Sequence, residues 1–158
     1  MRKAFFISIV FILLCTYETK AQEKIIGGII FASAGTTDFS TWEKPFAFGQ
    51  NLLPNVCIIT SDTYHNFVYG IANNSIRVVN GYPFGAHGLD VYIAPGVCLN
   101  SGIANLALGI EKNIKASDGV NFFIFSEFGK EMLNSSPLTF SIGFHVNIQG
   151  TLYHKKRF

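Results

Sequence analysis

The residues best suited to chemistry are three of the four histidines, because each has a carboxylate or a hydroxyl near it in the sequence. The pairs are His65 with Asp62, His87 with Asp90, and His145 with Ser141. Such groups can ligate a metal or act as general acids and bases. The first two pairs are three positions apart, and residues three apart on a strand point to opposite faces. The sequence has no HExxH, CxxC or nucleophile-elbow spacing, so we predict no metal, no cofactor and no catalytic residue.

Ser141, His145 and Glu127 are the residue types of a hydrolytic set. A serine nucleophile needs a histidine base and a carboxylate within hydrogen-bond reach, and some small barrels act on the acyl chains of lipids in this way. These three residues lie in no recognised motif. Lipid acyl hydrolysis is therefore our third hypothesis, and we expect a protein that is not an enzyme.

Four further residues could form a polar network inside a barrel, namely Arg77, Glu111, Glu127 and His145. A buried charge without a partner costs several kcal/mol, so such a network is stable only if its members pair. The alternative is that these residues stand at strand ends in contact with water.

Asn80 to Gly88 is the best candidate for a binding loop because it places aromatic residues between two predicted strands. Tyr82, Phe84 and His87 are its candidate contact residues. The alternative is an ordinary loop packed by its own aromatic side chains.

Cys57 and Cys98 remain in the mature chain if the protein is exported to an oxidising compartment. A disulfide between them is one possibility. Two buried apolar thiols are the other, because free cysteines are commonly buried.

The composition limits the kind of fold that positions these groups. The chain has 158 residues, 16 of them Phe and 15 Gly, with 49% hydrophobic and 14% charged residues. A soluble globular domain usually carries about 25% charged residues. A long disordered chain, a coiled coil and an electrostatic nucleic-acid binder all need more charge, so we expect one folded domain that binds no nucleic acid.

Residues 1–21 have the layout of a secretory signal peptide. Arg2 and Lys3 precede an apolar run from Ala4 to Cys15, and a more polar stretch ends at Ala21. The run is too short for a spanning helix, which needs about 20 residues. Loss of this segment turns 12 basic residues into 9 and 10 acidic residues into 9, so the mature domain, residues 22–158, is formally neutral.

Turn residues recur at short intervals along the mature chain, with aromatic and branched residues between them. The clearest strand runs from Leu138 to Gln149, where apolar residues alternate with small and polar ones. The other predicted strands are Ile25 to Ala32, Val56 to Ser61, Asn66 to Ala72, Ile76 to Asn80, Leu89 to Ala94, Asn105 to Glu111 and Val120 to Gly129. Turns are expected at Gly27-Gly28, Pro54-Asn55, Asn80-Gly81 and Pro95-Gly96, among others, and Gly35 to Pro54 is expected to form a long loop carrying Trp42.

About eight strands of this kind predict an all-β, antiparallel up-and-down barrel, with a soluble β-sandwich or a lipocalin-like barrel as the alternative. The less apolar face of each strand holds small residues and few charges, which favours a membrane barrel with its apolar face toward lipid. Phe67, Tyr69, Tyr92 and Phe128 would then form interfacial girdles. In the lipocalin-like alternative, Phe123, Phe125 and Phe140 would line an apolar pocket.

The signal peptide, the alternating strands from Ile103 to Gln149 and the terminal Phe158 resemble, in general form, the small outer-membrane β-barrel proteins of Gram-negative bacteria. The resemblance implies an outer-membrane location with membrane lipid as the main partner. We expect a structural, adhesive or surface-interaction role, in which another surface protein is a second partner. The alternative is a soluble periplasmic or extracellular barrel that binds a small apolar ligand.

Overall fold

The protein is represented by a computed structural model that describes residues 24–38, 47–60, 63–84, 88–117, 119–133 and 135–154. Eight strands make up the secondary structure of these ranges. They are β1 (Lys24–Asp38), β2 (Ala47–Ile59), β3 (Tyr64–Gly70), β4 (Ser75–Phe84), β5 (Leu89–Cys98), β6 (Ala104–Ser117), β7 (Val120–Glu131) and β8 (Leu138–His154). The predicted signal peptide, Trp42 and Phe158 lie outside the described residues. Within those ranges, no helix is long and apolar enough to cross a bilayer.

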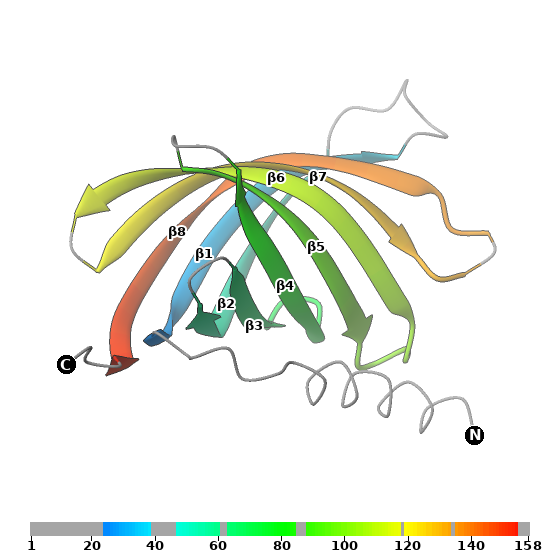
Figure 1. Cartoon of the computed structure of the whole chain (residues 1–158). Coiled ribbons are helices and arrows are strands. Elements are labelled where there is room, and N and C mark those ends of the chain that lie inside the picture. Colours follow the sequence, from blue (N-terminus) through cyan, green and yellow to red (C-terminus); the bar gives the residue numbers. More distant parts are fainter. Residues whose placement is uncertain are drawn as a thin grey trace.

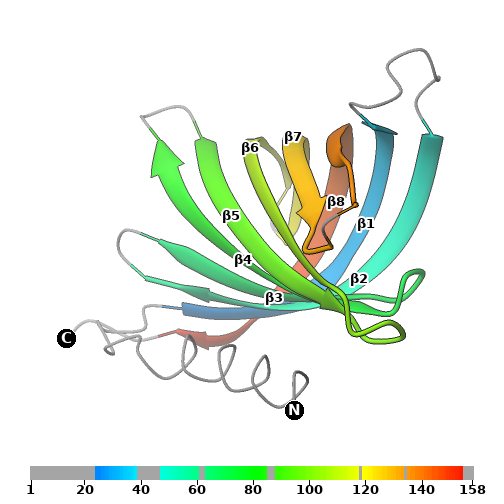
Figure 2. The ribbon, with the colours of Figure 1, turned by 90° about the vertical axis from the view of Figure 1, so that its right-hand side faces the viewer.

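The strands form a closed barrel in which each one pairs with its neighbour in the sequence. All neighbours are antiparallel, and β8 closes the barrel against β1 over the full length of β1, from Lys24 to Asp38. Figures 1 and 2 show the strands curving around a common axis from two directions. The predicted all-β barrel of about eight strands is therefore confirmed, and the sandwich alternative is wrong.

Several predicted turns are wrong because their glycine and proline residues lie within strands. Gly27-Gly28 belongs to β1, Pro54-Asn55 to β2, Asn80-Gly81 to β4 and Pro95-Gly96 to β5. The predicted loop from Gly35 to Pro54 is likewise shorter, because β1 continues to Asp38 and β2 begins at Ala47. Glycine occurs in such strands where another group approaches the backbone closely. A Cβ added to Gly28, for example, would collide with the backbone carbonyl of Ile148.

Side chains alternate between the interior and the exterior along each strand, as the period of two requires. On β8, Ser141, His145 and Asn147 line the interior, whereas Ile142 and Phe144 are exposed on the outside. β7 was ambiguous in the sequence because both of its faces are apolar. The structure turns Phe123, Phe125 and Glu127 inward and leaves Ile124 and Phe128 exposed outside.

Candidate functional site: the barrel interior

The interior of the barrel holds a cavity of about 930 Å³ that is lined by residues of all eight strands. Charged and amide side chains contribute to its wall together with Phe123 and Phe125. Among the described residues, the buried polar atoms without a hydrogen-bond partner are the Oδ1 atoms of Asn55, Asn113 and Asn147 and the Nε atom of Arg77. All of these residues except Asn55 belong to the cavity wall. The cavity wall is therefore mixed, with polar groups set among apolar side chains such as Ile30, Leu53 and Val68.

The first cluster in this cavity is built around Glu111 of β6. The Tyr64 hydroxyl of β3 donates a hydrogen bond to Glu111 Oε1 at 2.5 Å, and His145 Nε2 of β8 lies 3.9 Å from Glu111 Oε2. The imidazole is flanked by two rings of β7, with centroid distances of 4.5 Å to Phe123 and 5.9 Å to Phe125. The polar contacts of this cluster link β3, β6 and β8, no two of which are neighbours in the barrel.

The second cluster is built around Glu127 of β7. Its Oε2 atom lies 3.0 Å from Arg77 Nη2 of β4 and accepts a hydrogen bond of 3.0 Å from the Tyr92 hydroxyl of β5. The side chains of Arg77 and Glu127 are 30% and 15% exposed, so the ion pair is partly shielded from water. Three more strands are linked across the interior in this way.

The two tyrosines reach these carboxylates because glycines lie beneath their rings. Tyr64 is paired with Gly81 of β4, and Tyr92 is paired with Gly109 of β6. A Cβ on either glycine would collide with the tyrosine ring. Glycine at these positions lets each ring lie over the neighbouring strand and extend its hydroxyl farther across the interior, an arrangement used to stabilise glycine in sheets.

The structure thus places all four residues of the predicted network, Arg77, Glu111, Glu127 and His145, on the cavity wall. Sequence reasoning missed Tyr64 altogether and placed Tyr92 in an interfacial girdle. That position of Tyr92 is wrong, because the residue is 8% exposed and faces the interior. The signal that could have identified both is the inward position of a glycine on the next strand.

The hydrolytic set is not assembled. Ser141 Oγ is 2.9 Å from Thr36 Oγ1, and Glu127 is held by Arg77 and Tyr92. No hydrogen bond joins Ser141 to His145 in the described part of the chain. Over the same residues, no group of three or more His, Cys, Asp and Glu side chains is arranged to hold a metal ion.

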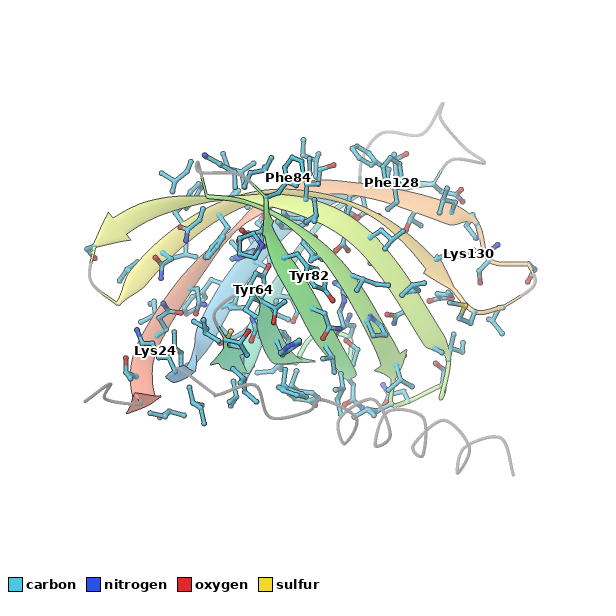
Figure 3. All side chains as sticks on the ribbon, in the orientation of Figure 1. Lys24, Tyr64, Tyr82, Phe84, Phe128 and Lys130 are labelled. Carbon is cyan, nitrogen blue, oxygen red and sulfur yellow. The ribbon has the colours of Figure 1, made fainter. Side chains whose placement is uncertain are left out.

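The candidate binding loop is largely a strand. Tyr82 and Phe84 lie in β4, where they are 46% and 66% exposed, and His87 is outside the described residues. Figure 3 shows Phe84 and Phe128 at the upper surface of the barrel and Tyr64 lower on the ribbon. The prediction of a loop is wrong for Asn80 to Phe84, because these residues pair with β5 from Leu89 to Ile93.

Cys57 and Cys98 are free thiols in the structure. Cys57 faces the cavity from β2 and is buried, whereas Cys98 ends β5 and is only partly covered. β2 and β5 are separated by two strands in the barrel. The bridge that the sequence left open is therefore not formed here.

A scan against protein-family models finds no match, and a search of curated proteins finds no similar sequence. Among the solved structures that resemble the chain in fold are the following three. Neisserial surface protein A is 11% identical, with 78% of this chain and 96% of that chain covered and a TM-score of 0.49. Outer membrane protein AlkL in lipid bilayers is 8% identical (90% and 98% covered, TM-score 0.42), and a de novo designed transmembrane β-barrel is 13% identical (77% and 96% covered, TM-score 0.43). The likeness to small outer-membrane barrels is one of general form.

Proposed function

We propose that this chain is an integral outer-membrane β-barrel with a structural or surface-interaction role and no catalytic activity. The observation that carries the proposal is the distribution of apolar and polar side chains between the outside and the inside of the closed barrel.

Large apolar side chains are exposed on the outside of every strand. They are Ile29 and Phe31 of β1, Val56 of β2, Tyr69 of β3, Ile76, Tyr82 and Phe84 of β4, Val91 and Ile93 of β5, Leu108, Ile110 and Ile114 of β6, Ile124 and Phe128 of β7, and Leu138, Ile142, Phe144, Ile148 and Leu152 of β8. Soluble monomers rarely expose contiguous apolar patches larger than a few hundred Å². A hydrocarbon layer stabilises such a surface, and closure of the barrel leaves no unpaired strand edge in it.

The interior argues against a soluble barrel that binds an apolar ligand. Such a barrel would line its pocket with apolar side chains, but here the carboxylates of Glu111 and Glu127 and the guanidinium of Arg77 lie among the apolar residues of the cavity wall. Phe140, which that hypothesis placed in the pocket, faces outward and packs against Phe128 with a ring distance of 5.1 Å. Two of the three aromatic residues, Phe123 and Phe125, do face the cavity.

A role without catalysis is supported by how the polar groups are used. Glu127 is engaged by Arg77 and Tyr92, and Glu111 by Tyr64, so each carboxylate already has protein partners. These side chains cross the interior between non-neighbouring strands and brace the barrel. Membrane lipid is the partner that the outer surface fits, and we expect any surface protein to bind the loops.

The membrane location is tested by one charge on the outer face. Ile142 is 49% exposed, and its cross-strand neighbours are Gly35 and Ser126, so its replacement removes little packing. Lysine on the lipid face costs about 2–4 kcal/mol near the bilayer midplane. Met132→Lys is the matched control, because Met132 is 57% exposed but follows the end of β7.

After expression with its export segment in a Gram-negative host, the wild-type chain and Met132→Lys should fractionate with membranes. Both should migrate differently before and after boiling, as closed barrels do. Ile142→Lys should lose most of this heat-modifiable band. Recovery of the wild-type chain in the soluble periplasmic fraction, or equal behaviour of the two lysine variants, would refute a membrane location.

A further inference from the structure

The shortest strand of the barrel is β3, which contains 7 residues. At the tilt and rise of transmembrane strands, this length crosses only about 18 Å, whereas the apolar band of such barrels is about 25 Å tall. The other seven strands have 10 residues or more. Figure 1 shows β3 as a short arrow between β2 and β4.

Polar groups end the apolar part of the outer face of β3 at the N-terminal end of the strand. His65 lies between the inward-facing Tyr64 and Asn66, so its side chain belongs to the outer face, where neighbouring groups cover all but 8% of the residue. Its Nδ1 atom lies 2.8 Å from Asn80 Oδ1 of β4, and its Nε2 atom lies 3.2 Å from Thr63 Oγ1. A polar pair of this kind is more stable near head groups and water than among acyl chains.

At the C-terminal end of β3, a turn of residues 71–74 follows, and its first two backbone amides donate hydrogen bonds to β2. The Ile71 amide donates to the Leu52 carbonyl at 3.2 Å, and the Ala72 amide donates to Asn51 Oδ1 at 3.0 Å. Irregular backbone can lie at membrane depth only where its polar groups are bonded within the protein. Ile71 itself continues the outward series of Phe67 and Tyr69 and is 50% exposed.

Asparagines fix the rest of this turn. Asn74 has a left-handed backbone with φ of 45° and accepts a hydrogen bond of 2.8 Å from the Leu99 amide at its own carbonyl. Its side chain accepts from the Tyr69 hydroxyl at 2.9 Å and donates to Asn100 Oδ1 at 2.5 Å. The apolar window of β3 is thus Phe67, Tyr69 and Ile71, closed by polar groups at both ends.

We infer that the barrel binds an abnormally thin layer of lipid along β3, so that the surrounding bilayer is compressed at this one side of the molecule. The inference rests on the proposed membrane location. The occupant of the surface is the acyl-chain layer, and the preferred lipid has short chains. Hydrophobic mismatch costs fractions of a kcal/mol per Å, so a local deficit of about 7 Å amounts to about a tenfold change in the folded-to-unfolded ratio.

The test compares variants in vesicles of dilauroyl, dimyristoyl and dioleoyl phosphatidylcholine, with the folded fraction measured by heat-modifiability across a urea titration. From dilauroyl to dioleoyl vesicles, the ratio of folded to unfolded wild-type chain should fall about tenfold. The double variant His65→Leu with Asn80→Leu lengthens the apolar window and should reduce this fall to less than about threefold. The readout is the difference between the wild-type chain and the double variant in how strongly the folded-to-unfolded ratio depends on lipid chain length, because this difference is specific to β3.

A second pair of variants decides the matter if the double variant fails to fold. Ile71→Lys shortens the window and should lose a further tenfold or so in dioleoyl vesicles but little in dilauroyl vesicles. Leu138 is 45% exposed at the start of the longest strand, β8. Leu138→Lys should therefore lower the folded-to-unfolded ratio by less than about threefold in either kind of vesicle. Equal chain-length dependence for Ile71→Lys and Leu138→Lys would overturn the inference and leave the membrane location intact. If the wild-type chain enters none of the vesicles, the membrane location is wrong and the inference fails with it.

Discussion

Replacement of Glu127 by glutamine tests whether the interior ion pair holds the barrel together. The substitution keeps the size and shape of the side chain and removes its charge. Glu127 Oε2 is 3.0 Å from both Arg77 Nη2 and the Tyr92 hydroxyl, so one atom joins β7 to β4 and β5. The variant therefore weakens contacts between three strands at once.

The expected cost lies between two known limits. Loss of one partner from a fully buried ion pair costs about 3–5 kcal/mol, whereas exposed pairs contribute about 1 kcal/mol or less. Arg77 and Glu127 are 30% and 15% exposed, so water screens the pair in part. The glutamine oxygen can also still accept a hydrogen bond. We therefore expect Glu127→Gln to destabilise the barrel by about 1–3 kcal/mol.

The assay is urea unfolding in lipid vesicles, followed by circular dichroism and by heat-modifiability. Glu131→Gln is the control, since Glu131 lies on the same strand, is exposed, and should change stability by less than about 0.5 kcal/mol. A double-mutant cycle with Arg77→Gln should give a coupling energy of about 1 kcal/mol or more. Additive effects of the two substitutions, or equal effects of Glu127→Gln and Glu131→Gln, would refute the bracing role of the pair.

Three further results are expected. Gly109→Ala should cost about 1–3 kcal/mol because its Cβ collides with the Tyr92 ring, whereas Gly49→Ala, with no atom within 4 Å of its Cβ, should cost less than about 0.5 kcal/mol; urea unfolding measures both. Cys98 should react with a maleimide in the folded barrel and the buried Cys57 only after unfolding, as mass spectrometry of the labelled chain would show. Glu111→Ala removes a side chain that fills part of the cavity and accepts the hydrogen bond of Tyr64. The interior of the variant is therefore wider, and the variant barrel should conduct more ions across planar bilayers than the wild-type barrel.

The parts of the fold that could be predicted are those where one strand carries its own signal. On β8, apolar and polar residues alternate over a long stretch, so the sequence alone indicates that His145 and Phe144 lie on opposite faces. The same alternation placed Glu111 of β6 on the less apolar face. A period of two does not depend on the neighbouring strands.

The errors arise where the meaning of a residue depends on its neighbour across the sheet. Asn80-Gly81 has the chemistry of a tight turn, but Gly81 serves as the position beneath the Tyr64 ring. Tyr92 has the residue type of an interfacial girdle, but Gly109 opposite it allows the ring to lie inward. Both assignments need the strand register, which a single sequence does not contain.

The register also explains how so few charged residues can brace the barrel across its interior. Tyr64, Gly81, Tyr92, Gly109 and Glu127 are successive partners on β3 to β7, so they form one row across five strands. The glycines in this row give the tyrosines a path to the two carboxylates, and the carboxylates in turn join strands that share no backbone hydrogen bonds. Backbone ladders close the barrel, but they leave its cross-section free to flatten. Side-chain bonds across the interior oppose flattening, which is why the few acidic residues of this chain are expected to matter more for its stability than their number suggests.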